Sequence, residues 1–251
     1  MLSCPISTKL STFATNMKMR KIIFIIVGLL TMTCVYAQYN IECEDTCNHI
    51  HGLDMSHYQG NVFWEAVEEV SGNKMHYVYL KATEGGNNID ERYLQNIEMA
   101  KKAGLKVGSY HFYRPRIAQE VQLSNFRAQC RPQDQDLIPM IDVESNGGLS
   151  ISAFCDSLHK FLILVENEYK QKPLVYTGQN FYNKYLVGEL DGYKLMIAKY
   201  SEPEPQLLDD RDIFAWQYTG KGHIRGVNGF VDKSRLLGRH TMREIRFIHN
   251  Q

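Results

Sequence analysis

Two carboxylates close together at the end of an apolar segment are the residues of this sequence best suited to chemistry. The segment LIPMIDVES, residues 137–145, starts as an apolar stretch and carries Asp142 and Glu144 near its end. Side chains at positions i and i+2 of a strand point to the same face, so the two carboxyl groups face the same way. Because like charges repel, one of the two acids should hold its proton to a higher pH. Such a pair is costly in a core and useful in an active site.

Taken alone, this pattern also fits a structural role. An acid at a strand end can form an ion pair with lysine or arginine, or it can cap the helix that follows. The choice between the two interpretations depends on which other side chains the fold brings to the same place.

The elements around this segment predict a barrel. Strand-like and helix-like segments alternate, which favours a parallel sheet, and eight strands suggest closure. The strand-like segments are residues 49–56, 77–85, 106–113, 137–145, 173–178, 194–200, 213–220 and 229–232. The helical patterns are residues 64–70, 92–104, 118–130 and 150–169. The last connections are too short for full helices, so we predict an irregular (β/α) TIM-like barrel with about eight strands and a helix-poor C-terminal part.

Acidic and aromatic side chains gather at the ends of these predicted strands. In a parallel barrel the active site lies at the carboxyl ends of the strands. The last predicted strand, for example, ends at Asp232. The full set is Asp54, Glu84, Tyr110, Tyr113, Asp142, Glu144, Tyr176, Tyr200, Trp216 and Asp232. A ring of acids and aromatics at one rim favours an active site over a scatter of structural residues.

The first 37 residues have the pattern of a secretory signal peptide. Arg20 and Lys21 precede an apolar run at 22–37 that ends in the small residue Ala37. The run is short for a membrane span and has no basic stop-transfer flank. We expect residues 1–37 to be a signal peptide, 38–48 a short N-terminal segment and 49–251 the functional domain. The predicted protein is exported to the periplasm, the cell surface or the medium, without stable membrane insertion after cleavage.

The charge of the mature chain argues against nucleic acid as a partner. The whole sequence has 28 basic and 28 acidic residues. The leader contains four of the basic residues and no acid, so residues 38–251 have 24 basic and 28 acidic residues, a net charge of −4. A nucleic-acid-binding protein would favour a basic face. A chain of this size suits a single domain, and we expect a monomer.

Four cysteines remain after removal of the leader: Cys43, Cys47, Cys130 and Cys155. Four cysteines allow three pairings, and a local bridge between Cys43 and Cys47 is the favoured one. A zinc site at these two cysteines would need a second ligand pair at suitable spacing, which the sequence does not supply.

A second metal hypothesis rests on four residues near the start of the domain, His49, His51, Asp54 and His57. On a strand His49 and His51 share a face, but Asp54 and His57 fall past the strand end. No metal is therefore predicted.

Eight short motifs, in their order along the chain, resemble one enzyme family. They are GLDMSHYQG, YLKATEG, GSYHFYRP, MIDVE, VYTG, IAKY, WQYT and GFVD. The set, over residues 49–235, resembles the family 25 glycoside hydrolases, the Chalaropsis-type lysozymes that cut bacterial peptidoglycan. The chain departs from the family pattern at Met196, where tryptophan is usual, and at Ser234, where asparagine is usual. Both departures concern fine specificity more than chemistry.

The resemblance implies an irregular (β/α) barrel and a muramidase without a cofactor. Such an enzyme hydrolyses the β-1,4 bond between N-acetylmuramic acid and N-acetylglucosamine. Carried over by motif, the active-site carboxylates are Asp54, Asp142, Glu144 and Asp232. Glu144 is the expected proton donor, because its longer side chain reaches further and the neighbouring acids should raise its pKa. Asp142 is expected to orient the acetamido group of the substrate.

The predicted substrate-binding residues surround these acids. Tyr110, Tyr176, Tyr200 and Trp216 are candidates for stacking on sugar rings, with barrel core as the alternative for each. Gln217 lies in the motif WQYT and is included with them. Lys81 and Glu84 complete the set, although these two also fit an ion pair at the rim.

Two other functions fit parts of the pattern. A chitinase-like hydrolase would carry the longer pattern D-x-x-D-x-D-x-E, which the segment DLIPMIDVE lacks. A non-catalytic peptidoglycan-binding barrel is the second alternative, but a pure binding protein has no need for four acids.

Overall fold

The structure is a computed structural model that describes residues 50–67 and 74–249. The chain divides into two units, Met1–Thr46 and Cys47–Gln251, and all described residues belong to the second. The predicted signal peptide, the segment 38–48 and the Cys43–Cys47 pairing lie outside the described residues, as does the second half of the helix predicted at 64–70. Within the described residues, no helix is both long enough and apolar enough for a membrane crossing.

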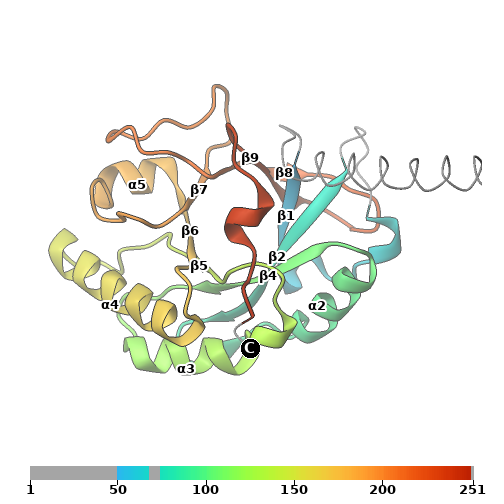
Figure 1. The fold of residues 1–251 in the computed structure, drawn as a ribbon, viewed down its shortest axis with the longest axis horizontal. Coiled ribbons are helices and arrows are strands. Elements are labelled where there is room, and N and C mark those ends of the chain that lie inside the picture. The colour runs from blue at the N-terminus through green and yellow to red at the C-terminus, as the bar shows by residue number, and fades with distance from the viewer. Residues whose placement is uncertain (1–49, 68–73, 250–251) are drawn as a thin grey trace, which may run out of the picture. The chain divides into compact units, whose positions relative to one another are not determined.

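One sheet forms the centre of the described fold (Figure 1). Its strands are β1 His51–Met55, β2 Met75–Glu84, β3 Asn88–Ile89, β4 Lys106–Phe112, β5 Met140–Asp142, β6 Leu174–Gly178, β7 Leu195–Ala198, β8 Ala215–Gly222 and β9 Val231–Leu236. Their order is β1-β9-β8-β7-β6-β5-β4-β2-β3, and β1 also pairs with β2. That pairing closes eight strands into a barrel, with β3 as a short antiparallel partner of β2.

Helices cover only part of the barrel. The α-helices of the described residues lie outside the sheet (Figure 1) and are α2 Tyr93–Lys102, α3 Gln119–Gln129, α4 Ile151–Tyr169 and α5 Gln179–Tyr185. The short 3-10 helices are η1 His57–Gln59, η2 Trp64–Ala66, η3 Pro132–Asp134 and η4 Met242–Ile245. No α-helix of the described residues follows α5, which confirms the irregular barrel with a helix-poor C-terminal part. Helix α5, a short helix between β6 and β7, was not predicted from the sequence.

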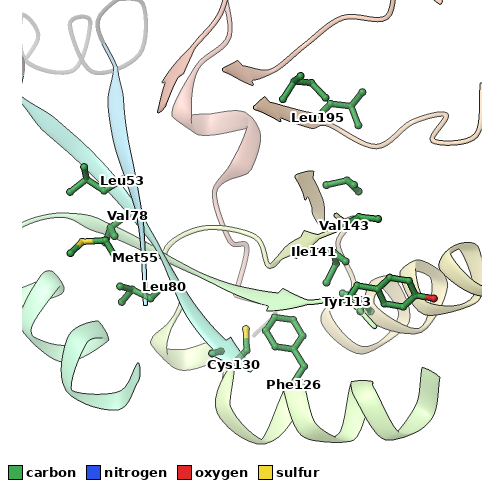
Figure 2. Packing of buried hydrophobic residues seen from close by; sticks show 14 of the residues in the cluster. Leu53, Met55, Val78, Leu80, Tyr113, Phe126, Cys130, Ile141, Val143 and Leu195 are labelled. Carbon is green, nitrogen blue, oxygen red and sulfur yellow. The ribbon is translucent and has the colours of Figure 1, made fainter. Parts of the chain in front are cut away.

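Strand alternation divides the core into two layers. Residues on one face of each strand, such as Tyr77, Tyr79 and Met140, fill the inside of the barrel. Residues on the other face, such as Val78 and Ile141, pack against the helices, and Figure 2 shows part of this outer layer. A barrel of eight strands is just wide enough for side chains to fill its interior. The closed interior leaves the rim as the place for a site.

The direction of β9 corrects one sequence-based expectation. The seven other barrel strands follow parallel pairings, but β9 runs antiparallel to both β1 and β8. The segment between Gly222 and Val231 is too short for a helical crossover, so β8 and β9 form a hairpin. Asp232 therefore lies at the beginning of β9 and not at the end of the last strand. Because the strand is reversed, its beginning lies at the rim where the parallel strands end.

Candidate active site

The four predicted acids come from three barrel strands and meet at one rim. Asp54 lies in β1 directly opposite Asp232 of β9 in the strand register. Asp142 is the last residue of β5, and Glu144 follows two residues later. Asp54 and Asp142 are 6% and 7% exposed, Asp232 is half-buried, and Glu144 is exposed. The site thus has buried carboxyl groups beneath one that reaches solvent.

Burial and mutual repulsion raise the pKa values of three of these acids. Burial raises the pKa of Asp54 to about 7, against a hydrogen bond from Gln217 that lowers it, and the charge of Asp232 adds to the rise. Burial also raises the pKa of Asp232 to about 6, with a contribution from the charge of Glu144. Because a carboxylate loses hydration on burial, such a site disfavours negative charge when empty and favours an incoming positive charge.

At the end of β5, the structure raises the pKa of the buried acid, Asp142. Sequence reasoning assigned the raised pKa to Glu144. In the structure the pKa of Asp142 is raised well above its usual range, first by burial and then by the charge of Glu144 and the hydrogen bond between them. Lys81 acts in the opposite direction. The buried acid of the pair therefore holds its proton to a high pH.

Two carboxylate oxygens at this rim are buried without a hydrogen-bond partner. They are Oδ1 of Asp54 and Oδ1 of Asp142. Buried polar atoms are nearly always hydrogen-bonded, so two unpaired acceptors need an explanation. A ligand that brings N–H or O–H donors to the rim would satisfy both.

Gln217 links the acids to two tyrosines. Its Nε2 donates to Asp54 Oδ2 over 2.9 Å. Its Oε1 accepts from the hydroxyl groups of Tyr176 and Tyr200 over 2.9 and 2.7 Å. Because an ionised carboxylate can only accept, Nε2 of the amide faces Asp54 and Oε1 faces the two hydroxyl groups. Gln217 is only 2% exposed, and the contacts of its amide are with side chains of the site.

A cavity of about 610 Å³ opens beside Glu144. Its walls come from the end of β6, the start of α5 and the segment after β7. Tyr176 and Tyr200 line it, together with Gln179 and Lys199. The volume lies within the range of sites that bind small organic molecules. Donors, acceptors and aromatic rings therefore surround the space next to the exposed acid.

The predicted stacking residues separate into two groups. Tyr176 and Tyr200 line the cavity, and the Tyr200 side chain is 60% exposed. Tyr110 packs against the inner layer of the barrel, and its pKa is raised by burial and then by the charges of Asp142, Asp54 and Asp232. These three tyrosines lie with the acids, as predicted.

Trp216 is the exception, and its predicted stacking role is wrong. The residue is 2% exposed and belongs to the outer hydrophobic layer, and its Nε1 donates to the carbonyl oxygen of Lys199 over 2.7 Å. A buried ring offers no free face to a sugar. Along β8, Ala215 and Gln217 point into the barrel and Trp216 points outward, so the period of two could have predicted both positions.

Met196, the first departure from the family pattern, is fully buried in the inner layer of the barrel. Ser234 is also fully buried, and its hydroxyl lies 2.9 Å from that of Tyr77. Both departures therefore lie in the barrel core.

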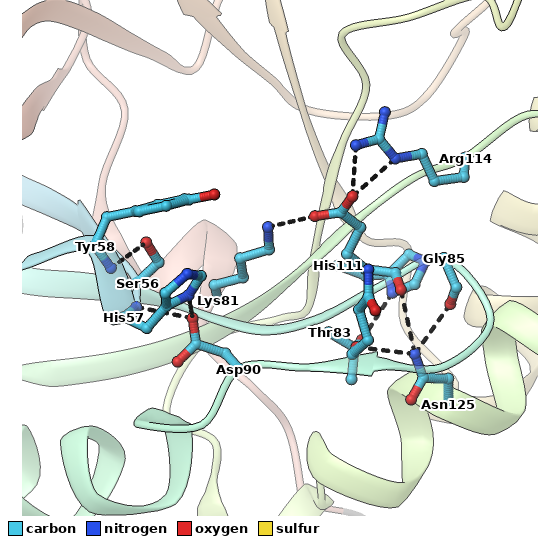
Figure 3. A network of polar contacts seen from close by, with 12 residues as sticks. Ser56, His57, Tyr58, Lys81, Thr83, Gly85, Asp90, His111, Arg114 and Asn125 are labelled. Carbon is cyan, nitrogen blue, oxygen red and sulfur yellow. Dashed lines mark hydrogen bonds and ion pairs between the residues drawn. The ribbon is translucent and has the colours of Figure 1, made fainter.

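Lys81 and Glu84 form an ion pair at the rim (Figure 3). The Nζ–Oε2 distance is 2.6 Å, and Arg114 binds the other oxygen of Glu84 over 2.5 Å. Lys81 also lowers the pKa of Asp142, so its ammonium group acts on the acid pair. The structure confirms the ion pair between these two residues.

The histidines of the first segment have other partners. The His57 ring lies 2.8 Å from Asp90, and the His51 ring lies 3.2 Å from the Tyr218 hydroxyl. Among the described residues, no group of three or more His, Cys, Asp or Glu side chains is arranged to hold a metal ion. Cys130 and Cys155 are both buried free thiols.

Comparison with known proteins identifies what the chain is similar to. The pattern of the family described as Glycosyl hydrolases family 25 matches residues 53–227. The protein named Uncharacterized protein YegX, from Escherichia coli strain K12, is 31% identical over 78% of this chain and 72% of its own length. Lysozyme M1 from Streptomyces globisporus is 27% identical over 75% of this chain and 68% of its own.

A solved structure shows the same fold. The bacterial lysozyme from Streptomyces coelicolor superposes with a TM-score of 0.70 at 26% sequence identity. The superposition covers 79% of this chain and 96% of that one.

Proposed function

The chain belongs to glycosyl hydrolases family 25, and we propose that it is an exported lysozyme acting on bacterial peptidoglycan. The bond cleaved is the β-1,4 bond between N-acetylmuramic acid and N-acetylglucosamine. The observation that carries the proposal is the set of four carboxyl groups at the barrel rim, of which Glu144 lines the cavity and two, Asp54 and Asp142, each have one buried oxygen without a hydrogen-bond partner. The similarity to Lysozyme M1 supports the choice of substrate.

Cleavage of a glycosidic bond needs a proton for the leaving oxygen and negative charge near the developing oxocarbenium centre. Glu144 is the proposed proton donor, because it is exposed and lines the cavity. Asp142 is buried beneath it and accepts the N–H of the substrate's acetamido group with its unpaired Oδ1. The acetamido oxygen then attacks the anomeric carbon, and water opens the resulting ring with net retention.

In this mechanism, substrate binding moves the proton of the acid pair from Asp142 to Glu144. In the empty site the proton of the pair favours Asp142, which forms a hydrogen bond with Glu144. A hydrogen bond donated by the acetamido N–H favours the ionised form of Asp142. The proton then moves along the hydrogen bond to Glu144, from which it passes to the leaving oxygen. The titration belongs to the pair and not to either acid alone.

Asp54 and Asp232 stabilise positive charge from the other side of the rim. The Gln217 amide fixes one oxygen of Asp54, so the unpaired Oδ1 has a defined direction. Positive charge that develops at the anomeric carbon offsets the repulsion between these carboxylates. Tyr200 is exposed, lines the cavity and is the proposed stacking residue there, and Tyr176 lines the same cavity.

The test is to incubate residues 38–251 with purified peptidoglycan and to identify the new reducing ends. The proposal predicts N-acetylmuramic acid at these ends. N-acetylglucosamine at the ends would contradict the assigned bond, and binding without release would indicate a non-catalytic barrel. Cleavage of chitin at a comparable rate would favour the chitinase-like alternative.

Export is the part of the proposal that depends on residues 1–37. The measurement is the N-terminal sequence of the protein recovered from its native cells. A mature start after Ala37, in a monomeric protein outside the cytoplasm, is the expected result. A protein that retains residues 1–37 would contradict the signal-peptide assignment.

A further inference from the structure

A further aromatic side chain, that of Tyr58, lies at the rim on the side away from the cavity. Tyr58 lies in η1, directly after β1, and its side chain is 80% exposed. Figure 3 shows its ring extending from the end of β1 towards Lys81, whose charge acts on Asp142. Exposed apolar side chains are common on protein surfaces, so the significance of Tyr58 depends on its place at the rim and on the contacts that hold it there.

The segment that carries Tyr58 is fixed in place. The Ser56 hydroxyl accepts from the backbone N–H of Tyr58, and the Gln59 side chain binds the backbone N–H of Ser56 over 2.8 Å. Gln59 also donates to the carbonyl oxygen of Phe230 in the β8–β9 connection. Tyr58 is therefore held at both ends of a short turn, so little side-chain and loop ordering would be needed for binding.

A buried carboxylate also supports the ring. Asp90 Oδ2 accepts from both the backbone N–H and the ring Nδ1 of His57, each over 2.8 Å, and the Asp90 side chain is 1% exposed. The His57 and Tyr58 rings have centroids 4.1 Å apart, with an angle of 37° between their planes. Asp90 fixes His57, and His57 lies against Tyr58.

The closed strand order places Tyr58 across the rim from the cavity. Around the ring, β1 lies opposite β6, and β2 lies opposite β7. The cavity is lined by residues at the ends of β6 and β7, and Tyr58 follows β1. The acids of β5 and β9 lie on the arcs between these two sides. A chain polymer that enters the cavity and crosses the acids would continue towards Tyr58.

We infer that Tyr58 is a stacking platform for a sugar ring of the same glycan strand, beyond the bond that is cut, and that Asp90 positions it through His57. The inference rests on the proposed function for the nature of the polymer. A flat, exposed aromatic ring binds the apolar face of a pyranose, and its contribution grows only when the glycan is long enough to reach it. Tyr58 thus selects long strands over short fragments.

The experiment measures kcat and KM on peptide-free glycan strands sorted by length. Tyr58→Ala should raise KM for long strands by about 5- to 20-fold. For the shortest oligosaccharide that the wild type cleaves, kcat and KM should stay within about 2-fold of the wild type, because that substrate does not reach the ring. Tyr58→Phe should behave like the wild type, and Tyr58→Leu like alanine. Ile163→Ala, which removes an exposed side chain on the outer helix α4, is the matched control.

Asp90→Asn tests the positioning role. It should raise KM for long strands in the same direction as Tyr58→Ala, and the double variant should be no worse than Tyr58→Ala alone. A merely structural role for Asp90 would instead lower the melting temperature and reduce activity at every strand length.

Binding measurements separate this inference from the proposed function. Calorimetry with long strands and the Glu144→Gln protein needs no turnover, and adding Tyr58→Ala should weaken that binding by a similar factor. Unchanged binding and unchanged KM for long strands would overturn the platform while leaving the lysozyme function intact. An equal loss at every length would also overturn it. No hydrolysis by the wild type, with binding still dependent on Tyr58, would refute the lysozyme function alone.

Discussion

Asp142 and Glu144 have different surroundings although only one residue separates them. Asp142 ends a buried strand and keeps its proton in the empty site, whereas Glu144 reaches the cavity. The same contrast explains Gln217, which is too buried to meet a sugar directly but holds Asp54 by a hydrogen bond of 2.9 Å. At the scale of single residues, the proposed mechanism assigns the chemical steps to exposed groups and the positioning of those groups to buried ones.

Replacing Gln217 tests whether its hydrogen bond positions Asp54. Gln217→Glu keeps the acceptor for both tyrosine hydroxyls but loses the donor to Asp54 and adds a neighbouring acid. Because the Gln217 hydrogen bond lowers the pKa of Asp54, the variant should raise that pKa above its present value of about 7. The kcat should fall about 10- to 100-fold, as for a lost hydrogen bond to a charged group.

Carboxyl-carbon NMR titration of Asp54 checks the shift, and Tyr200→Phe is the control. Tyr200→Phe removes one of the two hydroxyl donors to Gln217 and keeps the ring, so it should have a much smaller effect on Asp54. If Asp54 titrated at the same pH in Gln217→Glu as in the wild type, the proposed positioning role of Gln217 would be contradicted.

At the scale of elements, most of the barrel could be predicted from the sequence and its closing hairpin could not. Each of the eight barrel strands overlaps a segment predicted from apolar runs, although β9 extends to Leu236, beyond the predicted end at Asp232. The pattern does not contain direction, so the antiparallel β9 was missed. Asp232 was nevertheless placed at the correct rim. It was expected at the end of a parallel strand and lies at the beginning of an antiparallel one, and both positions are at the same rim.

Glycines let the inner layer of the barrel form. A Cβ on Gly52 of β1 would lie 2.1 Å from the ring of Tyr77, and one on Gly108 of β4 would lie 2.4 Å from the ring of Tyr79. Both tyrosines are fully buried inside the barrel, so neither ring has space to move away. Because the barrel interior is closely packed, only glycine fits at these two positions.

Gly52→Ala should therefore destabilise the protein by at least about 1–3 kcal/mol, the usual cost of overpacking. Chemical denaturation followed by circular dichroism measures the loss. Gly178→Ala is a matched control, because a Cβ at Gly178 would meet no atom within 4 Å. Equal stability of the Gly52 and Gly178 variants would show that the tyrosine packing at Gly52 is wrong.

At the scale of the whole molecule, the buried acids of the site lower the free energy of unfolding at neutral pH. Burial raises the pKa values of Asp54 and Asp232 to about 7 and about 6, above the ordinary value of 3.8. Between the ordinary and the raised pKa the folded state binds more protons than the unfolded state. Its stability therefore falls as pH rises from about 4 to about 7. The sequence shows that the acids gather, but the size of this penalty depends on burial, which only the folded chain reveals.

Asp54→Asn should relieve part of this penalty. The asparagine keeps an oxygen for Gln217 and carries no charge, so the free energy of unfolding at pH 8 should rise by about 1–3 kcal/mol. At pH 4 the folded Asp54 is already protonated, and the gain should nearly vanish. Thermal and denaturant unfolding at both pH values measure the difference. A gain of the same size at pH 4 and pH 8 would contradict the assigned titration.

The most direct test of the lysozyme account is the turnover of Glu144→Gln on purified peptidoglycan, measured beside its binding to the same glycan. The glutamine keeps the shape of the side chain and cannot deliver a proton. The account predicts that kcat falls by about 10²–10⁴-fold while the folded variant still binds the glycan. Near-normal turnover by Glu144→Gln would contradict the account, because the proton would then come from another group.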